Sequence, residues 1–323
     1  MTRVSTALLV LLVAALVASF GAGAGAGNGT PINPASANPL TLSIIGDLPY
    51  SAPQLAAFPA WVDEINADPK VDTVVHLGDI KSGSTLCSNA YYSTILGLFE
   101  SFKDPVVYTP GDNEWTDCHR TNNGGHNPLE RLATLRTMLF PEPGVTLGGR
   151  KKQVLAQAGY PENVLWLQSK AVFSTLHVVG SNNSLALWTG QAAVTPEQLA
   201  EATARIGAAI AWVDAAFDTA TENDAEGVVL TMQADTFFLS NETAAGFVDI
   251  LDRIEERAAS FGGPVLVLQG DTHVYVQDAP FAGAPNVTRI VVKGSAEAPG
   301  EEWLKLTVDP RAESFFSWQR IPF

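Results

Sequence analysis

The stretch from Val74 to Gly83, VVHLGDIKSG, joins a short apolar run to a glycine, a carboxylate and a small polar loop. Such a run is typical of a buried strand in an α/β sheet. Ligands of these sheets bind at the carboxyl ends of the strands, where a glycine lets the chain turn closely around them. Asp79 is therefore the first residue that we expect to carry chemistry.

The same pattern, an apolar run closed by Gly-Asp, occurs four times in the chain. Carboxylates that converge on one edge of a sheet repel one another unless a cation lies between them. The recurrence therefore predicts a cation site, whereas the alternative is that each aspartate only forms a turn or caps a helix. The aspartates are Asp47, Asp79, Asp112 and Asp271.

Strand and helix patterns alternate in the first part of the chain, which predicts parallel strands with right-handed crossovers. Antiparallel strands, a long helix and further strands follow, and the last three strands are expected at the edge of a second sheet. A polar segment, residues 115–127, is expected to be a surface loop. The expected strands are 40–45, one from Val74, 106–108, 164–167, 171–174, 176–179, 228–232, 265–268, 287–292, 303–308 and 315–320, and the helices are 51–67, 91–102, 128–140, 195–217 and 244–260.

The first residues predict export. A basic start, an apolar segment and Ala-x-Ala sites indicate a signal peptide over residues 1–26, followed by a low-complexity leader over 27–39 and one domain over 40–323. An uncleaved anchor is the alternative, although the apolar segment is short for a membrane span, and no later segment is apolar enough to span a membrane. A secreted or extracytoplasmic protein is thus expected. The formal net charge of −15 disfavours a nucleic-acid duplex as partner.

Two cysteines, Cys87 and Cys118, follow the second and third Gly-Asp pairs. In an oxidising compartment they are expected to form a disulfide that ties together two loops at the proposed site. The alternative is two separate buried thiols.

The order of these motifs resembles that of the calcineurin-like metallophosphoesterases, a family that includes the purple acid phosphatases. The family has Asp-x-His after the first strand, Gly-Asp after the second, Gly-Asn-His-Glu after the third, a lone His after a later strand and Gly-His-x-His near the end. The resemblance covers most of the chain beyond the leader and implies a four-layer α/β/β/α sandwich, in which helices flank two mixed sheets. The matching segments are 46–49, 78–79, 111–114, 230–233 and 270–273.

In this family two metal ions share the aspartate after the second strand and activate a hydroxide that attacks phosphorus. The resemblance therefore implies that Asp79 bridges two ions. Asp47 and His273 would bind one of them, and Asp112 and Asp271 the other. Gln233, or else Met232, would fill the lone-histidine position.

The chain departs from the family at several of these positions. Pro49 stands where the first motif has its histidine, and Asn113 stands where the third motif has the histidine that assists the leaving group. The remaining ligands are mostly oxygen atoms, which favour Mg²⁺, Mn²⁺ or Ca²⁺ over Zn²⁺, with iron as a further alternative and one or two ions bound. Ser82 replaces the tyrosine of the purple enzymes, so a purple di-iron centre is not expected.

Other residues are candidates for the lost catalytic roles. His119 could protonate a leaving oxygen, Arg120 could hold phosphate oxygens, and Asn113 occupies the family's catalytic position. Lys81 and Tyr50 are further candidates for contacts with phosphate or metal. The resemblance implies a secreted, metal-dependent phosphoesterase whose partner is a small-molecule phosphate ester. The alternative is a non-catalytic secreted binding protein, a pseudo-phosphoesterase that retains the fold.

Overall fold

Nearly every residue of the central strands is buried, so these strands are covered on both faces. The computed structural model describes residues 37–238, 245–294 and 301–323, which all belong to one unit within residues 31–323. Every residue of β1 (Leu40–Ile45) and of β8 (Val265–Gln269) is buried. Each sheet therefore needs a layer of structure on either side.

The described strands form two mixed sheets. In the five-stranded sheet the order is β12, β11, β1, β2, β3, with β1, β2 and β3 parallel. In the seven-stranded sheet the order is β4, β5, β6, β7, β8, β10, β9, with β6, β7, β8 and β10 parallel. The bounds are β2 (Val71–His76), β3 (Val106–Tyr108), β4 (Leu155–Gln157), β5 (Tyr160–Gln168), β6 (Ala171–Thr175), β7 (Gly227–Thr231), β9 (Val276–Asp278), β10 (Val287–Val291), β11 (Glu302–Val308) and β12 (Phe316–Pro322).

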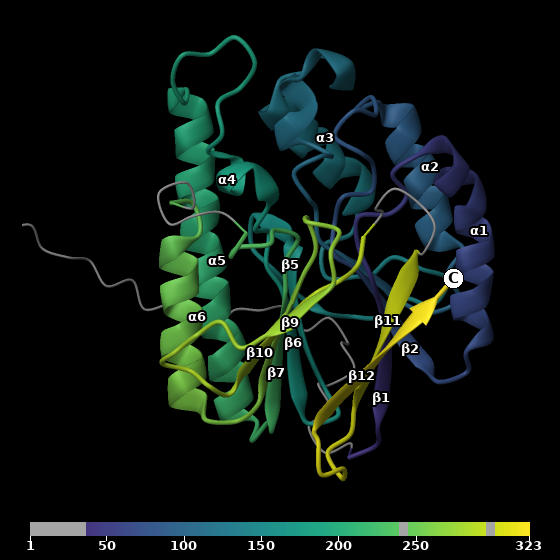
Figure 1. Cartoon of the computed structure of the whole chain (residues 1–323), viewed down its shortest axis with the longest axis vertical. Coiled ribbons are helices and arrows are strands. Elements are labelled where there is room, and N and C mark those ends of the chain that lie inside the picture. The colour runs from purple at the N-terminus through teal and green to yellow at the C-terminus, as the bar shows by residue number, and fades with distance from the viewer. Residues whose placement is uncertain (1–36, 239–244, 295–300) are drawn as a thin grey trace, which may run out of the picture. The chain divides into compact units, whose positions relative to one another are not determined.

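Helices cover the outer face of each sheet (Figure 1). Phe58, Ile95 and Leu135, one from each of α1, α2 and α3, pack with outward residues of β1, β2 and β3. Trp212 of α5 and Ile254 of α6 pack with the outer face of the other sheet. The bounds are α1 (Ala52–Ala67), α2 (Asn89–Glu100), α3 (Pro128–Leu139), α5 (Pro196–Glu222) and α6 (Val248–Phe261).

The remaining core lies between the two sheets. Successive side chains of a strand point to opposite faces, so Val74 joins the core beneath the helices while Val75 joins the central one. Leu42 from one sheet and Leu266 from the other also belong to this central core. Three cores between four layers confirm the predicted α/β/β/α sandwich.

Side-chain caps explain where several helices begin. Ser88 accepts a hydrogen bond from the Tyr91 N–H at 3.1 Å, just before α2. Before α5, Thr195 accepts a hydrogen bond from the Gln198 N–H at 3.2 Å in the same way, and Pro196 occupies the first position of this helix. Each cap satisfies one of the amides that a helix leaves unpaired at its start.

Three expectations about strands and helices were wrong. Residues 176–179 are not a strand, because the Leu176 N–H bonds to Thr231 O beside β7 and the chain then enters the short turn α4 (Gly180–Ser184). The last two strands extend the first sheet and not the second, because β11 pairs with β1 and β12 pairs with β11. Helix α6 begins at Val248, and the expected start at residue 244 lies outside the described residues.

The segment 115–127, expected to be a surface loop, is buried over its first residues, 115–118, whereas most of the residues that follow are exposed or half-buried. It forms the short 3₁₀ helices η1 (Thr116–His119) and η2 (Thr121–Asn123). Trp115 is fully buried, donates a hydrogen bond from Nε1 to His177 Nε2 at 3.1 Å and stacks under the Arg205 guanidinium. This side chain therefore anchors the segment into the interior.

Two predictions concern the ends of the chain and its cysteines. The signal peptide (1–26) and most of the leader (27–39) lie outside the described residues. Within the described ranges, no helix combines the length and apolar character needed to cross a membrane. The predicted disulfide is confirmed, because Cys87 and Cys118 are bonded and both are fully buried. It ties the loop after β2 to η1.

Replacing both cysteines in the variant Cys87→Ala/Cys118→Ala is expected to lower the free energy of unfolding by about 3 to 4 kcal/mol. The physical reason is that the bond, between residues 31 apart, restricts the unfolded chain. Urea unfolding followed by tryptophan fluorescence measures the change. Wild-type protein held in reductant should match the variant, and an unchanged free energy would contradict the expectation.

Candidate metal centre

The aspartates predicted from the sequence all follow strand ends. Asp47, Asp79 and Asp112 come after β1, β2 and β3, and Asp271 comes after β8 of the other sheet. Asp47, Asp79 and Asp271 have φ values of 54°, 56° and 75°, in the left-handed region that non-glycine residues seldom adopt. Strained backbone of this kind is concentrated at functional sites.

Two glycines allow the loops after β2 and β3 to touch. A Cβ atom on Gly78, whose φ is 95°, would lie 2.6 Å from the Gly111 nitrogen. A Cβ atom on Gly111 would lie 2.1 Å from Asp79 Oδ1. Only glycine at both positions permits this approach, which brings Asp79 and Asp112 to the same place.

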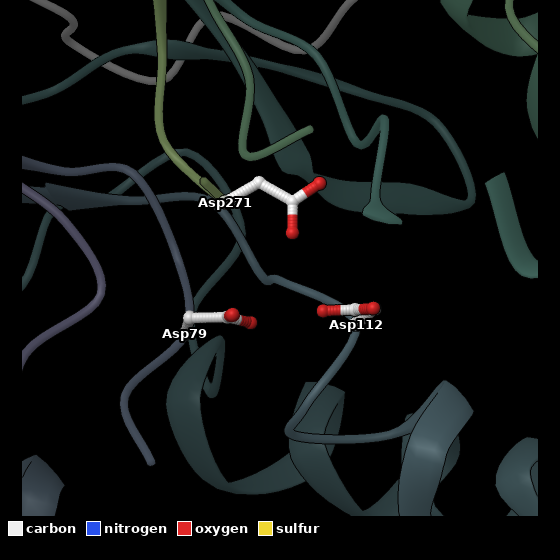
Figure 2. Close-up of side chains that lie close together, drawn as sticks. All are labelled: Asp79, Asp112 and Asp271. Carbon is white, nitrogen blue, oxygen red and sulfur yellow. The ribbon is translucent and has the colours of Figure 1, made fainter. Parts of the chain in front are cut away.

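Figure 2 shows the side chains of Asp79, Asp112 and Asp271 turned toward a common space. Each offers an oxygen atom, and these atoms all lie within 4.8 Å of one another. Asp79 and Asp112 are buried and Asp271 is half-buried. Burial, and next the charge of Asp112, raises the pKa of Asp271 to about 8. The same causes raise the pKa of Asp79 well above its ordinary range.

Asp47 and His273 lie beside this group. The Asp271 N–H donates to both carboxylate oxygens of Asp47, at 3.0 and 3.2 Å. His273 Nε2 lies 3.7 Å from Asp47 Oδ1, and this nitrogen is buried without a hydrogen-bond partner among the described residues. Burial, followed by the charge of Asp271, raises the pKa of Asp47 well above its ordinary range.

Tyr50 and Asn113 donate hydrogen bonds to Asp79. The Tyr50 hydroxyl lies 2.5 Å from Asp79 Oδ2, and Asn113 Nδ2 donates to the same oxygen at 2.7 Å. The Asn113 N–H reaches Asp79 Oδ1 at 3.2 Å. Asn113 Nδ2 also lies 2.9 Å from the Tyr50 hydroxyl. Both residues therefore hold the orientation of the Asp79 carboxylate.

Glu114 and Lys81 are buried next to the aspartates. Glu114 Oε1 accepts from the Asp79 and Gly111 N–H groups at 2.9 and 2.8 Å and from the Tyr108 hydroxyl at 2.8 Å. Lys81 is fully buried, donates to Asn123 Oδ1 at 2.8 Å, and has its pKa lowered to about 8 by burial. The sequence singled out no role for Glu114, although it is the last residue of the third motif.

A left-handed turn places Ser181 on the cluster. Residues 181–184 all have φ between 52° and 65°, and the Ser181 hydroxyl lies 2.8 Å from Asp112 Oδ2 and 3.0 Å from Asp117 Oδ1. Asn183 is held there by Arg205, which donates to its side chain and backbone oxygen atoms. Sequence analysis missed Ser181, and the available signal was the run Ser-Asn-Asn-Ser, because asparagine tolerates the left-handed region.

Gln233 lies where the lone histidine was expected, but its amide is already engaged. Gln233 Oε1 accepts a hydrogen bond from the Gly180 N–H at 2.7 Å. Gln233 Nε2 is buried with no partner at hydrogen-bonding distance among the described residues, yet it lies close enough to lower the pKa of the Asp271 carboxyl. A nitrogen that carries hydrogens is a donor and cannot bind a cation.

His119 and Arg120 differ in their relation to the cluster. Arg120 Nη1 forms an ion pair with Asp117 Oδ2 at 2.7 Å, and Asp117 contacts Ser181, so a chain of polar contacts joins Arg120 to Asp112. His119 Nδ1 instead accepts from the Thr189 N–H at 2.8 Å, and its ring stacks on Trp188. In the described part of the chain, no hydrogen bond joins His119 to the aspartates.

The charges and unpaired atoms of the site fit a divalent cation. Asp47, Asp79 and Asp112 are buried beside Glu114, and the positive charge of Lys81 interacts with the charges of Glu114, Asp79 and Asp112. The unpaired His273 Nε2 faces Asp47. Carboxylate oxygens with one imidazole form a donor set suited to hard or borderline ions.

The variant Gly180→Ala is expected to weaken binding of Mn²⁺ about 10-fold to 100-fold. Its new Cβ atom would lie 2.7 Å from Asp112 Oδ2 and 3.0 Å from Asp271 Oδ1, so both carboxylates must move. Calorimetric titration measures the affinity. The control is Gly207→Ala, an exposed helix position where nothing lies within 4 Å of the new atom. Equal affinities of the two variants would contradict the role of Gly180.

The metal-free protein is expected to lose stability as the pH rises from about 6.5 to about 7.5. In this range the unfolded state has ionised carboxylates, whereas Asp271, with a pKa of about 8, keeps its proton when folded. The folded state then binds more protons, so the free energy of unfolding falls by about 1 kcal/mol for each such group. Urea unfolding in chelator tests this. Saturating Mg²⁺ should remove this fall, and a rise in stability of the metal-free protein would contradict the expectation.

Comparisons with known proteins identify the family of the chain. The family model described as calcineurin-like phosphoesterase matches residues 40–204, and no curated protein sequence matches the chain. Among solved structures, a predicted phosphoesterase from Streptococcus pneumoniae is 9% identical with a TM-score of 0.36, covering 88% of this chain and 90% of that chain. GAP50, the anchor in the inner membrane complex of Plasmodium, is 8% identical with a TM-score of 0.46, covering 88% and 89%. By the match of the family model over half of its length, the chain belongs to the calcineurin-like phosphoesterases.

Proposed function

We propose that the protein is a metal-dependent hydrolase of small phosphate esters that acts outside the cytoplasm. The observation that carries this proposal is the convergence of Asp79, Asp112 and Asp271, whose oxygens lie within 4.8 Å of one another. Membership of the phosphoesterase family supports the reaction class. The predicted signal peptide and the buried disulfide support the location.

The residues that would hold a divalent ion are Asp79, Asp112 and Asp271, with Asp47 and His273 beside them. Oxygen donors favour Mg²⁺, Mn²⁺ or Ca²⁺. When bound, such an ion polarises a phosphoryl oxygen and lowers the pKa of a water molecule. Gln233 is assigned a supporting role, because its Oε1 atom already accepts from Gly180 and its Nε2 atom faces Asp271.

The chain's own side chains would orient the ligands and the substrate. Tyr50 and Asn113 hold the Asp79 carboxylate through hydrogen bonds to Oδ2. Ser181 holds Asp112. Arg120, whose side chain is 42% exposed, remains free to offer a second N–H group to a phosphate oxygen. A net charge of −15 favours a small ester over a nucleic-acid duplex.

The position of His119 favours substrates whose leaving oxygen does not need to be protonated by an acid of the protein. Its ring is held by Thr189 and Trp188, and Asn113 stands at the family's histidine position. An amide is not an acid that can protonate an alkoxide at neutral pH. Aryl phosphates, whose leaving groups are weak bases, are therefore expected to react faster than alkyl phosphates.

The lack of an acid among His119 and Asn113 that could protonate the leaving oxygen also favours a second candidate, a non-catalytic binding protein that retains the fold. In that case the cluster would hold an ion and bind a phosphate ester without cleaving it. The two candidates differ in turnover and not in metal binding.

An aryl-phosphate assay with Mg²⁺, Mn²⁺, Ca²⁺ and Zn²⁺ is the test. Asp79→Asn is expected to lose about 100-fold or more of the activity, because it removes a charge at the centre of the cluster. The matched control is Asp63→Asn, an exposed position of α1 that should keep full activity. Metal binding without turnover on mono- and diesters would favour the binding protein, and activity unchanged in Asp79→Asn would exclude the proposed enzyme.

A further inference from the structure

We propose that the cluster holds a single divalent ion, among Asp79, Asp112 and Asp271, and that Tyr50 and Asn113 close the neighbouring position beside Asp47 and His273. This inference rests on the proposed metal dependence and adds the number of ions. It depends on how the lone pairs of Asp79 are used.

The two oxygens of Asp79 have different surroundings. Oδ2 accepts hydrogen bonds from the Tyr50 hydroxyl at 2.5 Å and from Asn113 Nδ2 at 2.7 Å, which occupies both of its lone pairs. Two hydrogens directed at one oxygen repel a cation that approaches it. From the described residues, Oδ1 accepts only the longer bond from the Asn113 N–H at 3.2 Å. Oδ1 is therefore the atom left to bind an ion.

Tyr50 also stands against the other candidate ligands. The edge of its ring packs on His273, with the ring centroids 4.6 Å apart and the planes at 89°. Its backbone N–H donates to Gln54 Oε1 at 2.7 Å, which fixes the start of the side chain. A phenol is neutral at physiological pH and acts as a donor toward a carboxylate. Tyr50 thus links His273 to Asp79 by contacts that an ion shared between them would have to break.

Asp47 and His273 alone make a poor site. Asp47 already accepts the Asp271 N–H through both oxygens. Across the described ranges, one group of three acidic, histidine or cysteine residues has ligand atoms that lie mutually close, namely Asp79, Asp112 and Asp271. The first position therefore offers three protein ligands and the position beside Asp47 and His273 offers two, which favours binding of the ion at the first.

The surroundings of Asp271 give an independent indication of a ligand at this position. Gln233 is fully buried and its side chain interacts with Asp271, yet among the described residues its Nε2 atom has no partner at hydrogen-bonding distance. An unpaired buried amide costs about 1 to 3 kcal/mol. An occupant that accepts a hydrogen bond, such as a water molecule or a phosphate oxygen accompanying the ion, would satisfy it.

The number of ions can be measured directly with Mn²⁺. The full chain, stripped of metal, is titrated with Mn²⁺ and examined by native mass spectrometry and electron paramagnetic resonance. One ion per chain and the six-line spectrum of an isolated Mn²⁺ are expected. Two ions with an exchange-coupled spectrum would overturn this inference alone, whereas the absence of any bound ion would contradict the proposed function itself.

Variants test whether Tyr50 and Asn113 close the second position. The double variant Tyr50→Ala/Asn113→Ala removes both donors to Asp79 Oδ2, and it is expected to bind a second Mn²⁺ and give the coupled spectrum. Tyr91→Phe is the control, because the Tyr91 hydroxyl donates to the Ile80 carbonyl at 2.9 Å and to no carboxylate. It should keep one ion. A folded double variant that still binds one ion would refute the role of these two residues.

Discussion

Carboxylates that repel one another are held together in the interior of this protein, and the strand ends and loops around them fix their positions. Parallel strands from two sheets end at the same edge, so their loops deliver Asp79, Asp112 and Asp271 to one place. Burial raises the pKa of Asp79 and Asp271, which shows that the metal-free arrangement is electrostatically unfavourable. A bound cation would convert this repulsion into binding energy.

Support comes from groups one layer further out. Glu114 fixes the backbone of Asp79 and Gly111 through its Oε1 atom. Ser181 contacts Asp112 from a left-handed turn whose conformation costs about 1 to 2 kcal/mol per residue. Arg205 stabilises this turn through its hydrogen bond to Asn183. The strain in the turn therefore serves the orientation of a carboxylate in a different sheet.

The sequence was most informative where local pattern and topology agree. Apolar runs closed by Gly-Asp located β1, β2, β3 and β8 and predicted that Asp79 and Asp112 would meet, as they do. It was least informative where a side chain acts at long range. Nothing near Lys81 reveals that it is buried under the cluster, and His119 is drawn away by Thr189, which lies 70 residues further along the chain. Residues 176–179 failed as a strand because their backbone bonds to the end of β7 and to the loop after it, and the chain then turns into α4.

The contact between Gly78 and Gly111 has a consequence for how this architecture tolerates change. A carboxylate in the cluster can be exchanged for another donor while the backbone stays as it is. The two glycines have no such freedom, because any side chain at either one forces the loops apart. Distant relatives that have exchanged their ligands should therefore be recognised by this pair of glycines sooner than by the acids that they bring together.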